Sequence, residues 1–205
     1  MELLKKALLA ALLCNFASLA QATVLFSDNF NRSDNNTVGN GWVELEDDAN
    51  DVAIWNNSMR LRDYLPGNPD AASTNALSTA GYTDITLTFD WAASDNTESS
   101  DDLYVDWSSD GVTYHTLFHT GLGGSGFESV SLGPLGIGGH DPFYLRFWTD
   151  VSQSSEWAAI DNVVLSGTAV VANNPSTVPE PGTLALFGLG ILGFAGARRF
   201  AVARS

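Results

Sequence analysis

Apolar and polar residues alternate along short segments between residues 23 and 178. Within 85–91 every second residue is apolar, and the same period of two recurs in 59–62, 103–107 and 143–148. This period places side chains of one kind on one face of a β-strand. Glycine, asparagine, aspartate and serine separate the segments, and Asp110-Gly111 is a typical hairpin turn pair. The pattern therefore predicts strands joined by tight turns.

About ten such segments occur, and no stretch between 23 and 178 keeps a helical period. Many short strands with turn residues between them are typical of antiparallel sheets packed face to face. The long, aromatic-rich alternations favour a jelly roll, in which each sheet buries one face. The sequence therefore predicts an all-β, antiparallel β-sandwich over residues 23–172.

The N-terminal 22 residues have the pattern of a secretory signal peptide. Lys5 and Lys6 precede a mostly apolar run, 7–20, and Ala20-Gln21-Ala22 fits a small-x-small cleavage site. A signal helix removed before Thr23 is therefore expected. Two alternatives are a permanent membrane helix, for which the run is short, and lipid attachment at Cys14.

The C-terminal segment 179–205 combines a helix-breaking motif, an apolar run and a basic end. The motif is Pro179-Glu180-Pro181-Gly182, the run is 183–197, and Arg198 and Arg199 follow it directly. Arginines that end an apolar helix stay on the cytoplasmic side of a membrane. Fifteen apolar residues are marginal for a lasting span. A hydrophobic anchor helix that holds the protein briefly is expected, with 173–178 as a polar linker.

This tail resembles the PEP-CTERM sorting signal of Gram-negative bacteria that produce exopolysaccharide. The resemblance implies recognition by exosortase, a membrane enzyme, with cleavage near Pro179-Glu180-Pro181. It further implies transient anchoring in the inner membrane and then release to the cell surface or the exterior. An ordinary C-terminal membrane anchor is the alternative.

The charge of the middle of the chain limits its partners. Residues 23–178 hold 22 acidic side chains against four arginines, a net charge near −18. Such a domain repels nucleic acid, which is therefore not an expected partner. With Cys14 removed, the mature chain has no cysteine for disulfides, thiolate metal sites or nucleophilic catalysis.

Two segments resemble concanavalin-like and carbohydrate-binding jelly rolls. Residues 26–42, FSDNFNRSDNNTVGNGW, resemble their opening, and residues 157–167, WAAIDNVVLSG, resemble their closing strand and that of MAM domains. The resemblance implies a structural calcium that joins the first strand to the last. Asp28, Asn29 and Asp161 are the expected ligands, and an acid among apolar residues of the closing strand needs a partner. Hydrogen bonds from backbone amides to Asp161 are the alternative.

A carbohydrate-binding face is expected on the polar side of the strands. Aromatic rings stack on sugar rings, and arginine donates to hydroxyl groups. The alternative is that these residues cover the second face of the sandwich. The candidate residues, all on the strand parity opposite the apparent core, are Tyr144, Arg146, Trp148, Arg60 and Arg62.

Catalytic motifs are missing from the sequence. It has no Gly-x-Ser-x-Gly and no His-Glu-x-x-His, and Glu44–Asp48 does not match the paired-acid strand of sandwich glycosidases. His115 and His119, four apart, are expected on one face of a strand as ordinary surface histidines rather than a zinc site. The sequence therefore predicts a non-enzymatic protein that binds glycan or belongs to an exopolysaccharide matrix. A structural or adhesive protein without a small ligand and a glycoside hydrolase are the alternatives.

Overall fold

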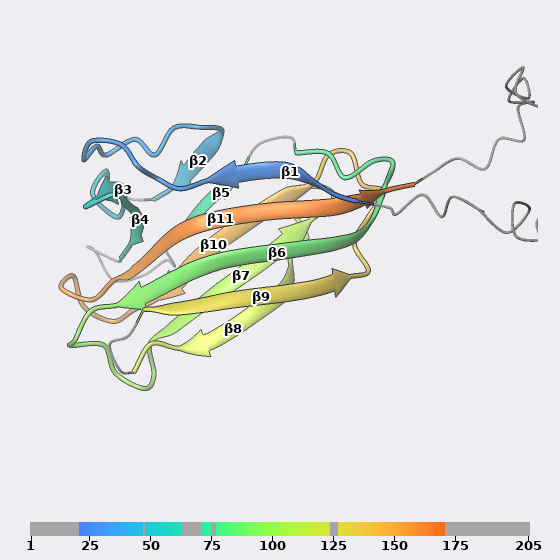
Figure 1. Cartoon of the computed structure of the whole chain (residues 1–205). Helices are drawn as coiled ribbons and strands as arrows, with labels where there is room; N and C mark the ends of the chain where they lie inside the picture. The colour runs from blue at the N-terminus through green and yellow to red at the C-terminus, as the bar shows by residue number, and fades with distance from the viewer. Residues whose placement is uncertain (1–20, 47, 63–70, 75–76, 124–126, 171–205) are drawn as a thin grey trace, which may run out of the picture. The chain divides into compact units, whose positions relative to one another are not determined.

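The computed structural model describes residues 21–46, 48–62, 71–74, 77–123 and 127–170. These residues form two antiparallel sheets, and the predicted all-β sandwich is confirmed (Figure 1). The strands are β1 (Ala22–Asp28), β2 (Trp42–Leu45), β3 (Val52–Trp55), β4 (Ser58–Leu61), β5 (Ala71–Thr74), β6 (Tyr82–Ala93), β7 (Asp102–Ser108), β8 (His115–Gly121), β9 (Glu128–Leu135), β10 (Tyr144–Asp150) and β11 (Ala158–Ala169).

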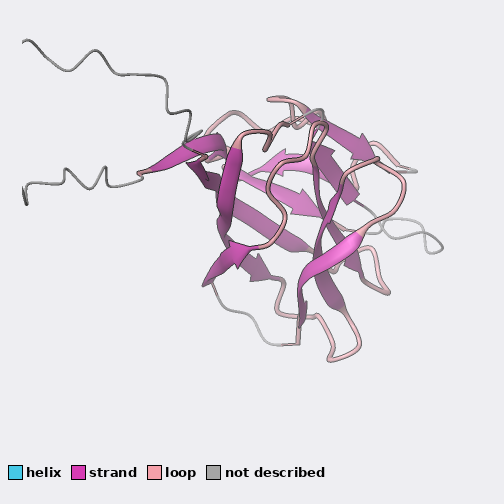
Figure 2. Cartoon of the chain, turned by 90° about the vertical axis from the view of Figure 1, so that its right-hand side faces the viewer, coloured by secondary structure: helices cyan, strands magenta, loops and turns pink. Residues whose placement is uncertain are grey.

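The two sheets share the strands unequally. One has six strands in the order β3-β4-β11-β6-β9, with β1 added alongside β11, and the other has five in the order β2-β5-β10-β7-β8. The turned view in Figure 2 shows strands and loops throughout the coloured part of the chain. Because β1 pairs with β11 from Ala22↔Thr168 to Asp28↔Val163, the first and last strands lie side by side.

The core lies between the sheets, where the alternation in the sequence predicted it. The side chains of Leu145 and Phe147 on β10, and of Phe143 just before it, are fully buried, and β6 buries Ile85, Leu87, Phe89 and Trp91. Phe89 of one sheet meets Phe147 of the other edge to face, with ring centroids 5.2 Å apart. Such aromatic pairs stabilise a core beyond the area that they bury.

The predicted hairpin joins β7 to β8. Asp110 closes its turn, since one carboxylate oxygen accepts the backbone N–H groups of Val112 at 2.8 Å and Thr113 at 2.7 Å. These bonds, the one to Thr113 first, lower the pKa of Asp110 to about 2. Gly111 follows at φ +72°, a conformation that glycine adopts without strain.

Two bulges change the side-chain parity that strict alternation predicts. The β7–β8 pairing shifts between Val105 and Asp106, so His115 pairs with Trp107 while His119 pairs with Tyr104. The prediction that the two histidines share a face is therefore wrong, and they cannot meet at one zinc ion. On β11 the register with β6 shifts between Asp161 and Val164.

The predicted signal helix, linker and anchor helix lie outside the described residues, as do Pro179, Glu180, Pro181, Gly182, Arg198 and Arg199. Within the part of the chain that the structure describes, no helix is long and apolar enough to cross a membrane.

Candidate functional site

The outer face of the five-stranded sheet carries three of the predicted sugar-binding residues. Tyr144, Arg146 and Trp148 alternate on β10 with the buried core residues, and each is partly exposed. Tyr144 packs beneath the β7–β8 turn, where a Cβ atom added to Gly111 would lie 3.2 Å from its ring. Arg146 and Trp148 therefore reach the open part of this face.

Three rings form a stack across neighbouring strands of this face. The ring of Trp148 lies 4.1 Å from that of Tyr104 at an angle of 8°, and Tyr104 lies 4.4 Å from His119 at 12°. We call Trp148, Tyr104 and His119 the ring row. Trp148 is opposite Tyr104 and Tyr104 is opposite His119 in the strand pairing, which sets the spacing of the rings. The stack occupies both faces of Tyr104, and the guanidinium carbon of Arg146 lies 5.7 Å from the ring centre of Trp148.

Two carboxylates hold the ring row in place. Asp106 accepts the indole N–H of Trp148 at 2.7 Å and the guanidinium of Arg146 at 2.6 Å. Asp102 lies 2.9 Å from Nε2 of His119 and accepts the hydroxyl of Tyr104 at 3.3 Å. Burial, followed by the charge of Asp102, raises the pKa of Tyr104, so its phenol remains a neutral donor.

Arg146 links the row to the hairpin. Its guanidinium carbon lies 3.7 Å from the ring centre of Tyr114, a close cation–π contact. The aromatic partners Tyr104, Tyr114 and His119 were not predicted as site residues. The sequence places Tyr104 on the same side of its strand as Asp106, which indicates an outward side chain. It does not reveal that β7 pairs with β10 and β8, so the ring contacts of Tyr104 could not be predicted.

The other two predicted residues lie elsewhere. Arg60 and Arg62 belong to β4 and its end, in the six-stranded sheet, so the five predicted residues do not share one face. Both arginines donate to the backbone carbonyl of Asn50. Arg60 also lies 5.2 Å from the ring centre of Trp55, whose ring meets that of Trp157 at 5.5 Å. Alternation along a strand shows which residues point outward but not which of the two sheets the strand belongs to. The prediction that placed these five residues together is therefore wrong.

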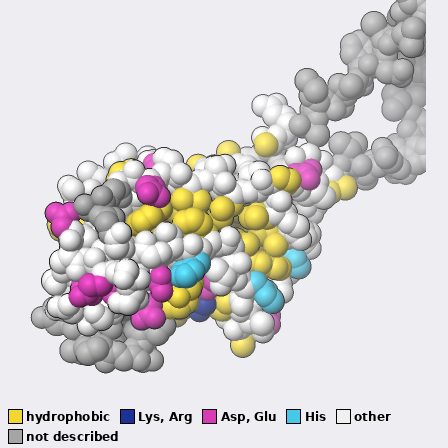
Figure 3. All heavy atoms as spheres, turned by 90° about the horizontal axis from the view of Figure 1, so that it is seen from below, with side chains coloured by type: hydrophobic (Ala, Val, Ile, Leu, Met, Phe, Trp, Pro, Cys, Tyr) yellow, Lys and Arg dark blue, Asp and Glu magenta, His cyan; other side chains and the backbone are white. Residues whose placement is uncertain are grey.

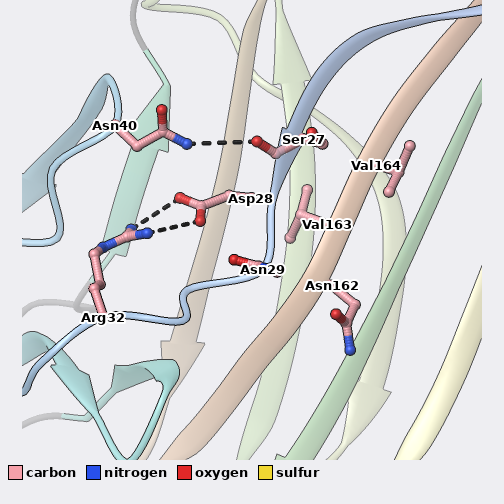
Figure 4. A pocket seen from close by; sticks show the side chains of 8 residues that line it. All are labelled: Ser27, Asp28, Asn29, Arg32, Asn40, Asn162, Val163 and Val164. Carbon is pink, nitrogen blue, oxygen red and sulfur yellow. Dashed lines mark hydrogen bonds and ion pairs between the residues drawn. The ribbon is translucent and has the colours of Figure 1, made fainter.

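The residues predicted to bind calcium do not fit that ion. Asp28 is buried, and its two oxygens accept the two terminal guanidinium nitrogens of Arg32 at 2.8 and 2.9 Å (Figure 4). They also accept the indole N–H of Trp42 at 2.9 Å and the backbone N–H of Phe30 at 2.8 Å. Burial alone would raise the pKa of Asp28, but the bonds from Arg32 and Phe30 outweigh it and the pKa is lowered. Arg32 therefore supplies the positive charge that a cation was expected to supply.

The other two predicted calcium ligands, Asn29 and Asp161, also accept hydrogen bonds from backbone amides. Asn29 accepts the backbone N–H of Asn31 at 3.2 Å. Asp161 lies at the β11 bulge, is only partly buried, and accepts the N–H of Asn162 at 2.7 Å. Burial raises its pKa, and the charge of Asp90 raises it further. The alternative expected for Asp161, a hydrogen bond from a backbone amide in place of a calcium ion, therefore agrees with this geometry. The polar pocket between β1 and β11 in Figure 4 is lined by Asp28 and Asn162 but not by Asp161.

Apolar side chains are visible at one edge of the sandwich. Seen from below, apolar side chains form a band with histidines at its margin, while acidic side chains lie toward one end (Figure 3). The edge strands there are β8 and β9, and their partly buried apolar residues include Leu117, Phe118, Val130, Leu132 and Leu135. These side chains pack on the core from an open edge.

The chain is similar to known proteins in two separate parts. Residues 177–199 match the PEP-CTERM protein-sorting motif, and the protein is therefore an exported one with a C-terminal membrane-anchor signal. No curated protein matches the sequence.

Solved structures similar to this chain include β-sandwich adhesin domains and carbohydrate-binding modules. The K3 cleaved adhesin domain of Lys-gingipain from Porphyromonas gingivalis W83 is 18% identical with a TM-score of 0.55, covering 71% of this chain and 99% of that one. A structure described under endo-acting O-glycanases of the human gut microbiota is 7% identical with a TM-score of 0.52, covering 71% and 100%. A family 29 carbohydrate-binding module is 13% identical with a TM-score of 0.47, covering 72% and 92%. The first two similarities support the fold alone.

Proposed function

We propose that this exported protein is a non-enzymatic polysaccharide-binding protein of the cell surface or extracellular matrix. It binds through the outer face of the five-stranded sheet. The observation that carries the proposal is the ring row, because three aligned rings on a solvent-facing sheet surface are fixed by Asp102 and Asp106 rather than buried in the core.

The chemistry of this face suits a sugar polymer. The exposed parts of the Trp148 and His119 rings offer apolar surface for the C–H side of a sugar ring, and the partly exposed side chains of Asp102 and Arg146 can bond to hydroxyl groups, while Asp106 is buried beneath them. Because the hydrogen bonds already orient both rings, little side-chain entropy is lost on binding.

The charge of the domain indicates which polymer is bound. Residues 23–178 carry a net charge near −18, and Arg146 on this face is already paired with Asp106 at 2.6 Å. An anionic polymer would be repelled without gaining an unpaired cation. A neutral polysaccharide is therefore the proposed ligand class.

The sorting tail would bring the sandwich to the cell exterior, where polysaccharide is available. Exosortase processing near Pro179-Glu180-Pro181 would release the sandwich from the inner membrane toward the polysaccharide outside.

The carboxylates of this face do not favour a hydrolase. Asp102 and Asp106 are engaged by His119, Tyr104, Trp148 and Arg146, whereas a glycosidase needs one carboxylate to attack or to activate water.

Trp148→Ala tests the proposal. In an affinity gel with the polysaccharide of the producing bacterium, the full chain in detergent should be retarded, and the variant should lose about tenfold or more in affinity because one terminal ring face is gone. Trp55→Ala is the matched control, since Trp55 is an aromatic residue 40% exposed on the other sheet. Equal retardation of wild type and Trp148→Ala would refute the assignment, and circular dichroism checks that both variants fold.

A further inference from the structure

Three acidic side chains from two loops meet at one end of the sandwich. Glu98 and Asp101 belong to the β6–β7 loop, and Glu156 belongs to the β10–β11 loop. Their carboxylate oxygens all lie within 4.8 Å of one another. We call these three residues the acidic cluster. Glu98 is exposed, whereas Asp101 is 1% exposed and Glu156 is fully buried.

One oxygen of Glu156 points to a missing partner. Its Oε2 accepts the backbone N–H groups of Ser152 at 3.1 Å and Gln153 at 2.7 Å. Its Oε1 is buried and has no hydrogen-bond partner. A buried carboxylate oxygen without a partner is costly, because neither water nor a donor replaces its lost hydration.

No cationic side chain compensates the acidic cluster among the described residues. The salt bridges between described residues join Arg32 to Asp28, His119 to Asp102 and Arg146 to Asp106, and none involves the acidic cluster. Glu98 accepts the neutral side-chain amide of Gln153 at 3.4 Å. Repulsion from Glu156 is the first cause that raises the pKa of Glu98. Three carboxylates thus crowd together with no side chain to balance them.

We propose that Glu98, Asp101 and Glu156 bind one calcium ion through their carboxylate oxygens. Oxygen ligands alone favour a hard cation over zinc or copper. Two oxygens that share a calcium ion at about 2.4 Å lie at most about 4.8 Å apart, and the carboxylate oxygens of the acidic cluster all lie within that limit. Magnesium demands a near-ideal octahedron and gives up its water reluctantly, so a cluster of three carboxylates from two loops favours calcium.

The position of the acidic cluster gives the ion a structural role. The β6–β7 loop crosses from the six-stranded sheet to the five-stranded sheet, and the β10–β11 loop crosses back. Both loops lie at the end of the sandwich opposite the start of β1 and the end of β11 (Figure 1). One ion therefore joins both sheet-crossing connections and holds the two sheets together at that end.

Calcium titration of the full chain in detergent after EDTA treatment tests this site. The melting temperature should rise by about 5–10 °C when calcium exceeds its dissociation constant about a hundredfold, because the ion binds only the folded state. Magnesium at the same concentration should produce a clearly smaller rise. Calorimetry should give one ion bound per chain, and the absence of both binding and a thermal shift would overturn the proposal.

Variants locate the ion. Glu156→Gln should abolish the calcium response, while Asp161→Asn should keep it, because Asp161 lies at the β11 bulge and outside the acidic cluster. Glu98→Gln guards against a folding failure, since Glu98 is exposed. It should match or exceed wild type in EDTA, where it relieves repulsion, and bind calcium at least about tenfold more weakly. Loss of the response in Asp161→Asn, or an unchanged affinity in Glu98→Gln, would contradict the site.

Discussion

Asp28→Ala is expected to lower the melting temperature of the full chain by about 5–15 °C. The carboxylate of Asp28 is buried and accepts donors from Arg32, Trp42 and Phe30. Removing one partner of a buried charge pair costs about 3–5 kcal/mol, and the partial exposure of Arg32 reduces this to about 2–4 kcal/mol. In a chain of this size each kcal/mol shifts melting by about 2–4 °C.

The same network makes a prediction about pH. The pKa of Asp28 is lowered in the folded state, so its ion pair stabilises the fold above the unfolded pKa, near 4. That stability is lost as the pH falls through the folded pKa. The gap in stability between wild type and Asp28→Asn should therefore narrow below about pH 4 and stay constant from pH 5 to pH 7.

Asp95→Ala is the control for this network, because Asp95 is exposed in a loop. Thermal unfolding followed by circular dichroism should show almost no change in this variant. A melting temperature of Asp28→Ala within a degree of wild type would mean that Arg32 and Trp42 find other partners, and that this network does not fasten β1 to the loop that follows it.

Deletion of residues 179–205 is expected to abolish membrane retention. The matched PEP-CTERM motif covers 177–199, so the truncated chain loses both the sorting signal and the apolar run. It should appear outside the inner membrane without any later shortening. The intact chain should instead pass through a membrane-bound form and mature by losing about 2–3 kDa from its C-terminus.

A second variant separates anchoring from processing. Replacing Pro179, Glu180 and Pro181 by alanine keeps the apolar run and the arginines but removes the motif. This chain should remain in the membrane fraction at full length. Mass spectrometry of the mature wild-type protein gives the decisive reading, because an intact Ser205 would contradict exosortase processing.

The sequence predicted those features of the fold that depend on one strand alone, because the alternation of apolar and polar residues within a strand shows which of its faces is buried. The alternation on β6 and β10 follows from one buried face, so Phe89 and Phe147 could be placed in the core, and the outward direction of Trp148 could be predicted too. The turn at Asp110-Gly111 was predictable for the same local reason. In each case one segment contains the whole signal.

The features that were missed depend on pairing between distant segments. The opposite faces of His115 and His119 arise from a bulge, which alternation cannot reveal, and Asp106 is buried on the outer face where Arg146 and Trp148 of the neighbouring strand donate to it. Arg60 was grouped with Trp148 because parity does not say which sheet a strand joins. Glu156 gave no signal at all, since its burial beside Asp101 depends on two loops that meet only after the sheets pack.

Oxidative footprinting of the tryptophans is the most direct test of the proposed polysaccharide-binding face. The full chain is oxidised with and without a neutral polysaccharide from the producing bacterium, and modification is read by mass spectrometry at Trp148, Trp55 and Trp157. The account predicts that the polysaccharide protects Trp148 and leaves Trp55 and Trp157 unchanged. Protection of Trp55 and Trp157 with Trp148 unaffected would place binding on the six-stranded sheet and contradict it.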